Sequence, residues 1–89
     1  MLTYKMQFNK KYGFEKNASH SIYEISLITG YNINGLKMIL LKGQGAYRSS
    51  PASVRPSVHN STQWGLARIY SAVMGGKASI VDANQLYKR

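Results

Sequence analysis

The sequence predicts a small all-α domain of three to four helices, on the basis of three observations. Apolar residues recur at helical spacing in three separate segments. Capping residues precede those segments, and glycines follow them. The chain has 89 residues, 44% of them hydrophobic, and no cysteine, so a single hydrophobic core must support the fold without disulfides or thiolate-bound metal.

The N-terminal residues differ in character from the rest of the chain. Residues 1–19 alternate lysines with aromatic residues, and we expect them to form a basic, aromatic arm. Such an arm could contact phosphate groups, or it could be an ordered tail whose aromatic side chains dock on the body of the protein. Residues 20–89 form a single helical domain in this prediction.

A helix-turn-helix-like pair is predicted over residues 21–42. Ser21 stands three residues before Glu24, which is the spacing of a capping box, and Gly30 ends the first helix with a residue that tolerates positive φ. The second helix runs from Asn32 or Ile33 to Lys42, and Gly43 closes it.

The rest of the chain is predicted to hold a loop and two further helices. A long ordered loop covers residues 43–60, because glycine, serine and proline dominate it. A third core helix covers residues 61–74, capped by Asn60 and carrying one stripe of mostly small residues that lets another backbone come close. A short fourth helix, Ala83 to Tyr87, is capped by Asp82.

The pair at 21–42 resembles the helix-turn-helix of bacterial repressors. That motif has an apolar residue at its fourth position, a small residue at its fifth and a glycine at its ninth. Apolar residues then follow at its tenth, fifteenth and eighteenth positions. These positions hold Ile25, Ser26, Gly30, Tyr31, Leu36 and Ile39. By this resemblance the second helix would present Asn32, Asn34, Lys37 and Met38 to the major groove. The same spacing also builds helical hairpins that never touch DNA, because it encodes the turn and the packing.

Most of the chain resembles a family of small, largely uncharacterised proteins from large DNA viruses and some marine phages. The stretches that carry this resemblance are SIYEISLITGYNINGLKMILLKGQGAYRSSP, SVRPSV and QWGLARIYSAVMGGKA, within residues 20–86. In that family a helix-turn-helix-like segment is followed by G-x-G-A-[YW], an arginine-proline step and W-x-x-A-R-x-x-S. The resemblance implies a viral setting, in the virion or the host cytoplasm, and implies no settled activity.

Charge is the main indication of a partner. Twelve Lys and Arg residues face three acidic residues, which gives a net charge of +9 and a pI near 10.1. Such an excess attracts polyanions, so nucleic acid, an anionic membrane surface or an acidic protein could supply the opposite charge. We expect the nucleic-acid contacts to come from Asn32, Asn34, Lys37, Lys42, Arg48, Arg55 and Lys77.

Arg68 lies in the middle of the third predicted helix, between apolar neighbours. It could extend to bind phosphate, or it could fold back and donate to carbonyl groups of the 43–60 loop. We favour the second alternative, in which Trp64, Arg68 and Tyr70 hold the loop in place.

An enzyme is not expected. Glu15, Glu24 and Asp82 are the only carboxylates, and the two histidines stand apart from them in sequence, too few groups for acid–base pairs or a metal cluster. We expect no cofactor and no metal. The N-terminus holds no apolar run like that of a signal peptide, and no stretch approaches the roughly 18 apolar residues of a membrane span, so we expect neither secretion by a signal peptide nor membrane insertion.

The leading hypothesis is therefore a small basic viral protein that contacts nucleic acid, with DNA preferred, through phosphates, in a nucleoid or another genome-associated role. The alternative is a minor capsid or cement protein, which should leave its N-terminal arm disordered when alone and expose a large apolar patch. A third hypothesis, an inhibitor that docks on an acidic host protein, rests on charge alone. The oligomeric state does not follow from the sequence.

Overall fold

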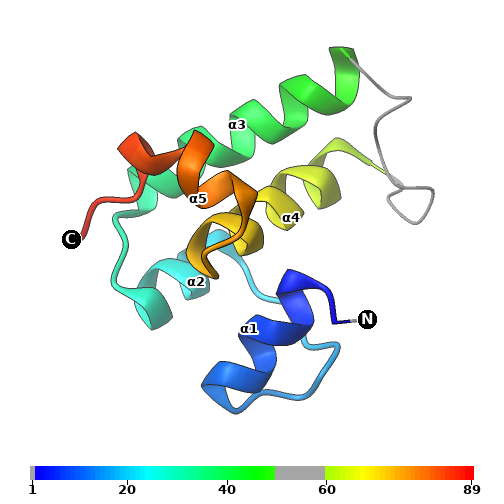
Figure 1. The fold of residues 1–89 in the computed structure, drawn as a ribbon, viewed down its shortest axis with the longest axis vertical. Coiled ribbons are helices and arrows are strands. Elements are labelled where there is room, and N and C mark those ends of the chain that lie inside the picture. The colour runs from blue at the N-terminus through cyan, green and yellow to red at the C-terminus, as the bar shows by residue number, and fades with distance from the viewer. Residues whose placement is uncertain (1, 50–59) are drawn as a thin grey trace.

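The computed structural model describes residues 2–49 and 60–89, and over these ranges the fold is all-α, as predicted. Figure 1 shows α3 and α4 running alongside each other, with α1 and α2 on one side of them and α5 packed against α4. Within the described ranges the elements are α1 (Tyr4–Tyr12), α2 (Ile22–Thr29), α3 (Ile33–Ser49), α4 (Ser61–Val73), α5 (Lys77–Val81) and the 3₁₀ helix η2 (Ala83–Gln85).

The predicted helix pair has the expected local structure. Ser21 and Glu24 form a complete capping box, and Gly30 ends α2 at φ 81° with its N–H bonded to the Ser26 carbonyl. The Asn32 side-chain oxygen accepts a hydrogen bond from the Asn34 N–H at 2.9 Å, at the start of α3. Local capping chemistry thus sets the start and the turn of this pair.

The second helix is longer than predicted, and the expected loop over 43–60 is wrong for its first seven positions. α3 continues through Gly43 to Ser49, while residues 50–59 lie outside the described residues. The reason is tertiary. Gly43 is buried against α4, where an added Cβ would lie 2.6 Å from the Cα of Gly65. Burial of α3 against α4 offsets the roughly 1 kcal/mol that glycine costs a helix interior.

The segment expected to be an arm contains helix α1. The Thr3 hydroxyl caps this helix by accepting from the Met6 N–H, and Gly13 ends it at φ 79°. Phe8 is fully buried in the core, and its ring meets that of Tyr70 edge-on at 5.3 Å. Residues 4–12 therefore pack as part of the helical domain.

The polar side chains beneath α1 are also satisfied. Asn9 is fully buried and donates to the carbonyls of Lys16 and Ala18, both at 2.9 Å. Its oxygen lies 2.6 Å from Nε2 of His20, which in turn packs between the rings of Phe8 and Phe14. This network holds the 13–20 connection against α1.

The C-terminal region differs from its prediction. Asn60 caps α4 through the Gln63 N–H at 2.8 Å, as expected, and α4 ends at Val73. The expected helix Ala83–Tyr87 is absent: α5 precedes Asp82, η2 follows it, and the Asp82 side chain makes no capping bond. The carboxylate is buried instead, where it meets two cations. In the part of the chain that the structure describes, no helix has the length and apolar character needed to cross a membrane.

The contact between α3 and α4 gives a direct test, because two of the three glycines in α3 are in opposite situations. Gly43→Ala would place a methyl group against the α4 backbone, and we expect the free energy of unfolding to fall by about 1–3 kcal/mol. An added Cβ at Gly45 would meet nothing within 4 Å, so Gly45→Ala should raise the free energy of unfolding by up to about 1 kcal/mol.

Urea denaturation of the two variants and the parent chain measures both changes. Equal effects of the two substitutions would contradict the close approach of α3 and α4.

Candidate nucleic-acid interface and adjoining groove

The outer face of the helix pair is open to solvent. Leu36 and Ile39 of α3 are fully buried, whereas Asn34, Lys37 and Met38 are exposed. The structure thus places three of the four predicted reading residues on one solvent-facing stripe. Asn32 is half-buried, and its side-chain oxygen is already used to cap α3.

The C-terminal residues run beside this turn. The Asn32 N–H donates to the Tyr87 carbonyl at 2.7 Å, and the Arg89 N–H donates to the Gly30 carbonyl at 3.0 Å. Gly35 makes this approach possible, because a side chain there would collide with the Gln85 carbonyl. One flank of α3 is therefore covered, and its outer stripe stays exposed.

This pairing brings two further cations to the turn. The Lys88 ammonium donates to the Thr29 carbonyl at 2.9 Å and lies 4.0 Å from the centre of the Tyr31 ring. Arg89 donates to the Leu27 carbonyl at 3.4 Å. Sequence analysis missed both residues, because the pairing joins positions about 60 apart in the chain. The only local signal was the pair of basic residues next to each other at positions 88 and 89.

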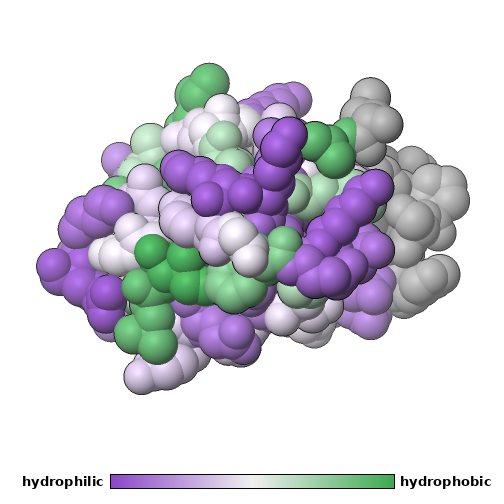
Figure 2. All heavy atoms as spheres, turned by 90° about the horizontal axis from the view of Figure 1, so that it is seen from below, coloured by the Kyte–Doolittle hydropathy of each residue, from purple (hydrophilic) through white to green (hydrophobic). Residues whose placement is uncertain are grey.

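The surface around α1 and α2 is mostly polar. Figure 2 shows this side of the molecule, where hydrophilic residues lie between several separate hydrophobic areas. The exposed large apolar side chains of α2 are Tyr23, at 61% exposure, and Leu27, at 48%. They lie four residues apart and therefore share one face of that helix.

An ion network around one buried carboxylate joins α3, α4 and the end of α5. Asp82 is fully buried and accepts hydrogen bonds from Arg68 Nε at 2.7 Å and Nη2 at 2.9 Å. Lys42 donates to the same carboxylate at 3.3 Å. Burial by itself would raise the pKa of Asp82, but the hydrogen bonds and charges of Arg68 and Lys42 outweigh it and lower that pKa.

This network changes the role of several predicted residues. The sequence favours donation from Arg68 to loop carbonyls, but the described structure pairs Arg68 with Asp82. A carboxylate is a stronger acceptor than a carbonyl, and Asp82 lies too far along the chain for helical spacing to indicate the pair. Lys42 also binds Asp82, so part of its charge is already compensated. Tyr70 lies in the core against Phe8 and is not brought together with Trp64 and Arg68.

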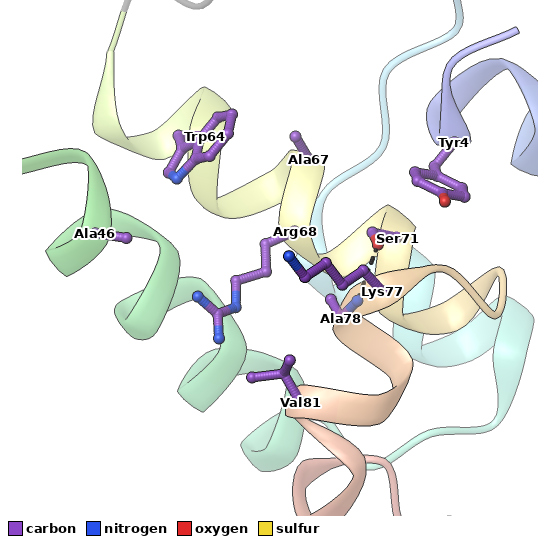
Figure 3. Close-up of a pocket in the computed structure, with 9 residues that line it drawn as sticks. All are labelled: Tyr4, Ala46, Trp64, Ala67, Arg68, Ser71, Lys77, Ala78 and Val81. Atoms are coloured by element: carbon purple, nitrogen blue, oxygen red, sulfur yellow. Dashed lines mark hydrogen bonds between the residues drawn. The ribbon is translucent and has the colours of Figure 1, made fainter. Parts of the chain in front are cut away.

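Beside this network lies an open groove of about 430 Å³, lined mostly by apolar atoms. Tyr4 of α1 and Lys77 of α5 lie on its border, and α3 and α5 supply further small or apolar side chains. Figure 3 shows how α4 presents four residues to the groove, Trp64, Ala67, Arg68 and Ser71. These are the four named positions of the W-x-x-A-R-x-x-S pattern, and their spacing places them on one helix face.

The other residues predicted to contact nucleic acid are not among the three that form the exposed stripe of α3. Lys77 and Arg48 are exposed, at the start of α5 and near the end of α3, and Arg55 lies outside the described residues. Residues 2–49 and 60–89 contain no group of three His, Asp or Glu side chains that could hold a metal ion.

Comparison with known proteins identifies the family but not an activity. Residues 2–88 match a family of unknown function (DUF5824), and the chain belongs to that family. No curated protein and no solved structure matches the chain.

The buried carboxylate makes stability depend on pH. The pKa of Asp82 is lower in the folded chain than its ordinary value, so its contribution to stability is complete above about pH 4 and is lost as the pH falls through the lower, folded-state pKa. We expect Asp82→Asn to reduce the free energy of unfolding by about 3 kcal/mol at neutral pH, because two cations lose their partner. It should also flatten the decline in stability at acid pH.

Thermal or urea unfolding between about pH 7 and pH 2 measures both effects. Glu15→Gln removes an exposed carboxylate that has no ion pair among the described residues, and it serves as the charge-matched control. Equal free energies of unfolding for the two variants would contradict the expected contribution of the ion network to stability.

Proposed function

We propose that this protein binds nucleic acid through phosphate contacts, with the exposed stripe of α3 and the cations of the adjoining turn as the centre of the interface. The observation that carries the proposal is a large uncompensated positive charge. Of twelve Lys and Arg residues, only Lys42 and Arg68 pair with a carboxylate in the described ranges, and both use Asp82. The other two carboxylates, Glu15 and Glu24, are too few to balance the remaining cations.

The position of the cations supports this choice of surface. Lys37 projects from the exposed stripe of α3, while Lys88 and Arg89 sit at the carboxyl end of α2, across the same turn. Three cations around one exposed helix give a local surface to which a polyanion is attracted. Neutralising phosphates releases bound counterions, which supplies most of the affinity in non-specific binding.

The composition of the stripe favours limited sequence preference. Base reading requires side chains whose donors and acceptors match base edges, typically arginine, asparagine or glutamine. Among the described residues of the stripe, only Asn34 has such a side chain, beside one lysine and Met38. Phosphate contacts therefore dominate the proposed binding.

A genome-associated role in a virus is the setting that the sequence resemblance suggests for such binding. The alternative, a minor capsid or cement protein, expects an N-terminal arm that is disordered in the isolated chain. Residues 4–12 instead form a helix whose Phe8 is fully buried, and this favours the nucleic-acid proposal.

The first test is a titration of a labelled DNA duplex of about 20 base pairs, followed by fluorescence anisotropy between about 50 and 200 mM salt. We expect binding in the micromolar range or tighter at low salt, with a steep negative salt dependence. Failure to bind even at the lowest salt would overturn the proposal for DNA, and a duplex RNA of the same length would extend the test to RNA.

Lys37→Ala tests the location of the interface. We expect it to weaken binding about equally for unrelated duplex sequences and to reduce the slope of log K against log salt by about 1. Lys10→Ala makes the same charge change at an exposed position near the end of α1 and is the matched control. Equal effects of the two variants would show diffuse attraction and would contradict an interface centred on α3.

A further inference from the structure

We propose that the groove beside α4 is a binding site for an unpaired base of single-stranded nucleic acid, which stacks on Trp64 while a neighbouring phosphate meets Lys77. This inference rests on the proposed nucleic-acid function and adds a second site to it. The groove is separate from the exposed stripe of α3, and it gives the protein a way to distinguish single strands from duplexes.

The shape and lining of the groove suit a flat apolar ligand. Its volume of about 430 Å³ falls in the range of ligand pockets, and it is open to solvent. The side chains that line the groove along α4 and α5 include three small ones, those of Ala67, Ser71 and Ala78. They leave the space between the two helices open. Trp64 is only half-buried, which leaves part of its indole available for stacking.

The polar groups of the groove leave positive charge at its edge. The Ser71 hydroxyl is engaged by the Ala78 N–H at 3.2 Å. Arg68, which lines the groove, shares the buried carboxylate of Asp82 with Lys42, so these three side chains together carry net positive charge. Lys77 adds another cation, and Figure 3 shows its side chain extending along the groove. None of the described residues that line the groove carries a carboxylate, so the charge of the groove complements a phosphate next to an apolar group.

These features favour a single strand over a duplex. In a duplex the faces of the bases are covered by stacking, and a base enters a pocket only after it is flipped out at a cost of a few kcal/mol. Every unpaired base offers an apolar face and an adjacent phosphate without that cost. An acidic peptide with an aromatic side chain has a similar pattern, and the experiment below separates it from a single strand.

Trp64 is the only tryptophan of the chain, so its fluorescence reports on the groove alone. We would titrate the full chain with an unlabelled oligothymidylate of about 12 nucleotides, and with a duplex of the same length. Stacking should quench Trp64 on addition of the single strand. The duplex should bind, as followed by anisotropy of a labelled copy, with little change in Trp64 emission.

Ala67→Leu fills the groove and keeps the reporter. We expect it to abolish most of the quenching and to weaken single-strand binding by about 5- to 100-fold, while duplex affinity changes by less than about twofold. Ala83→Leu makes the same substitution at an exposed position outside the groove and should leave both affinities unchanged. Lys77→Ala should lower the salt slope of single-strand binding by about 1. Far-ultraviolet circular dichroism checks that each variant keeps its helices.

The possible outcomes separate this inference from the proposed function. Duplex binding without Trp64 quenching by the single strand would overturn the groove site and leave the proposed function standing. No binding to either nucleic acid would overturn both. Quenching by a glutamate-rich peptide with one central phenylalanine, together with none by the single strand, would also overturn the inference, because it would identify the groove as a peptide site.

Discussion

The buried carboxylate of Asp82 connects the parts of this domain that carry its proposed chemistry. It accepts hydrogen bonds from Arg68 on α4 and Lys42 on α3, and it directly follows α5. Taking a carboxylate out of water costs several kcal/mol, which only well-placed cations can offset. The network therefore restricts how these three helices can be arranged. It also positions one residue of the groove, since Arg68 lines that groove and donates two hydrogen bonds to Asp82.

The second constraint is the close approach of α3 and α4. Gly43 and Gly65 face each other with no room for a Cβ on either, so the two helix backbones pack nearly in contact. Each glycine weakens its own helix, and the tertiary contact compensates for this. The result is a closely packed pair of helices that carries two different surfaces, the exposed stripe of α3 and the groove beside α4.

Charge explains why these surfaces suit an anionic partner. Two of the twelve basic residues share the one buried carboxylate, and the others repel one another across a small domain. Binding of a polyanion, as proposed, would relieve that repulsion in addition to forming new contacts. The family to which the chain belongs has no assigned function, so the functional proposal depends on where the cations lie relative to α3 and to the groove.

The sequence by itself determined the features that depend on neighbours a few residues apart. The capping box of Ser21, the glycine that ends α2, the Asn60 cap and the all-α fold class all follow from such local contacts. Only the tertiary structure decided the partner of Arg68, the extension of α3 through Gly43, and the packing of Phe8. Arg68 and Asp82 are 14 residues apart, and Lys42 and Asp82 are 40 apart. Helical periodicity carries no information about contacts at such separations, because they depend on how complete helices pack.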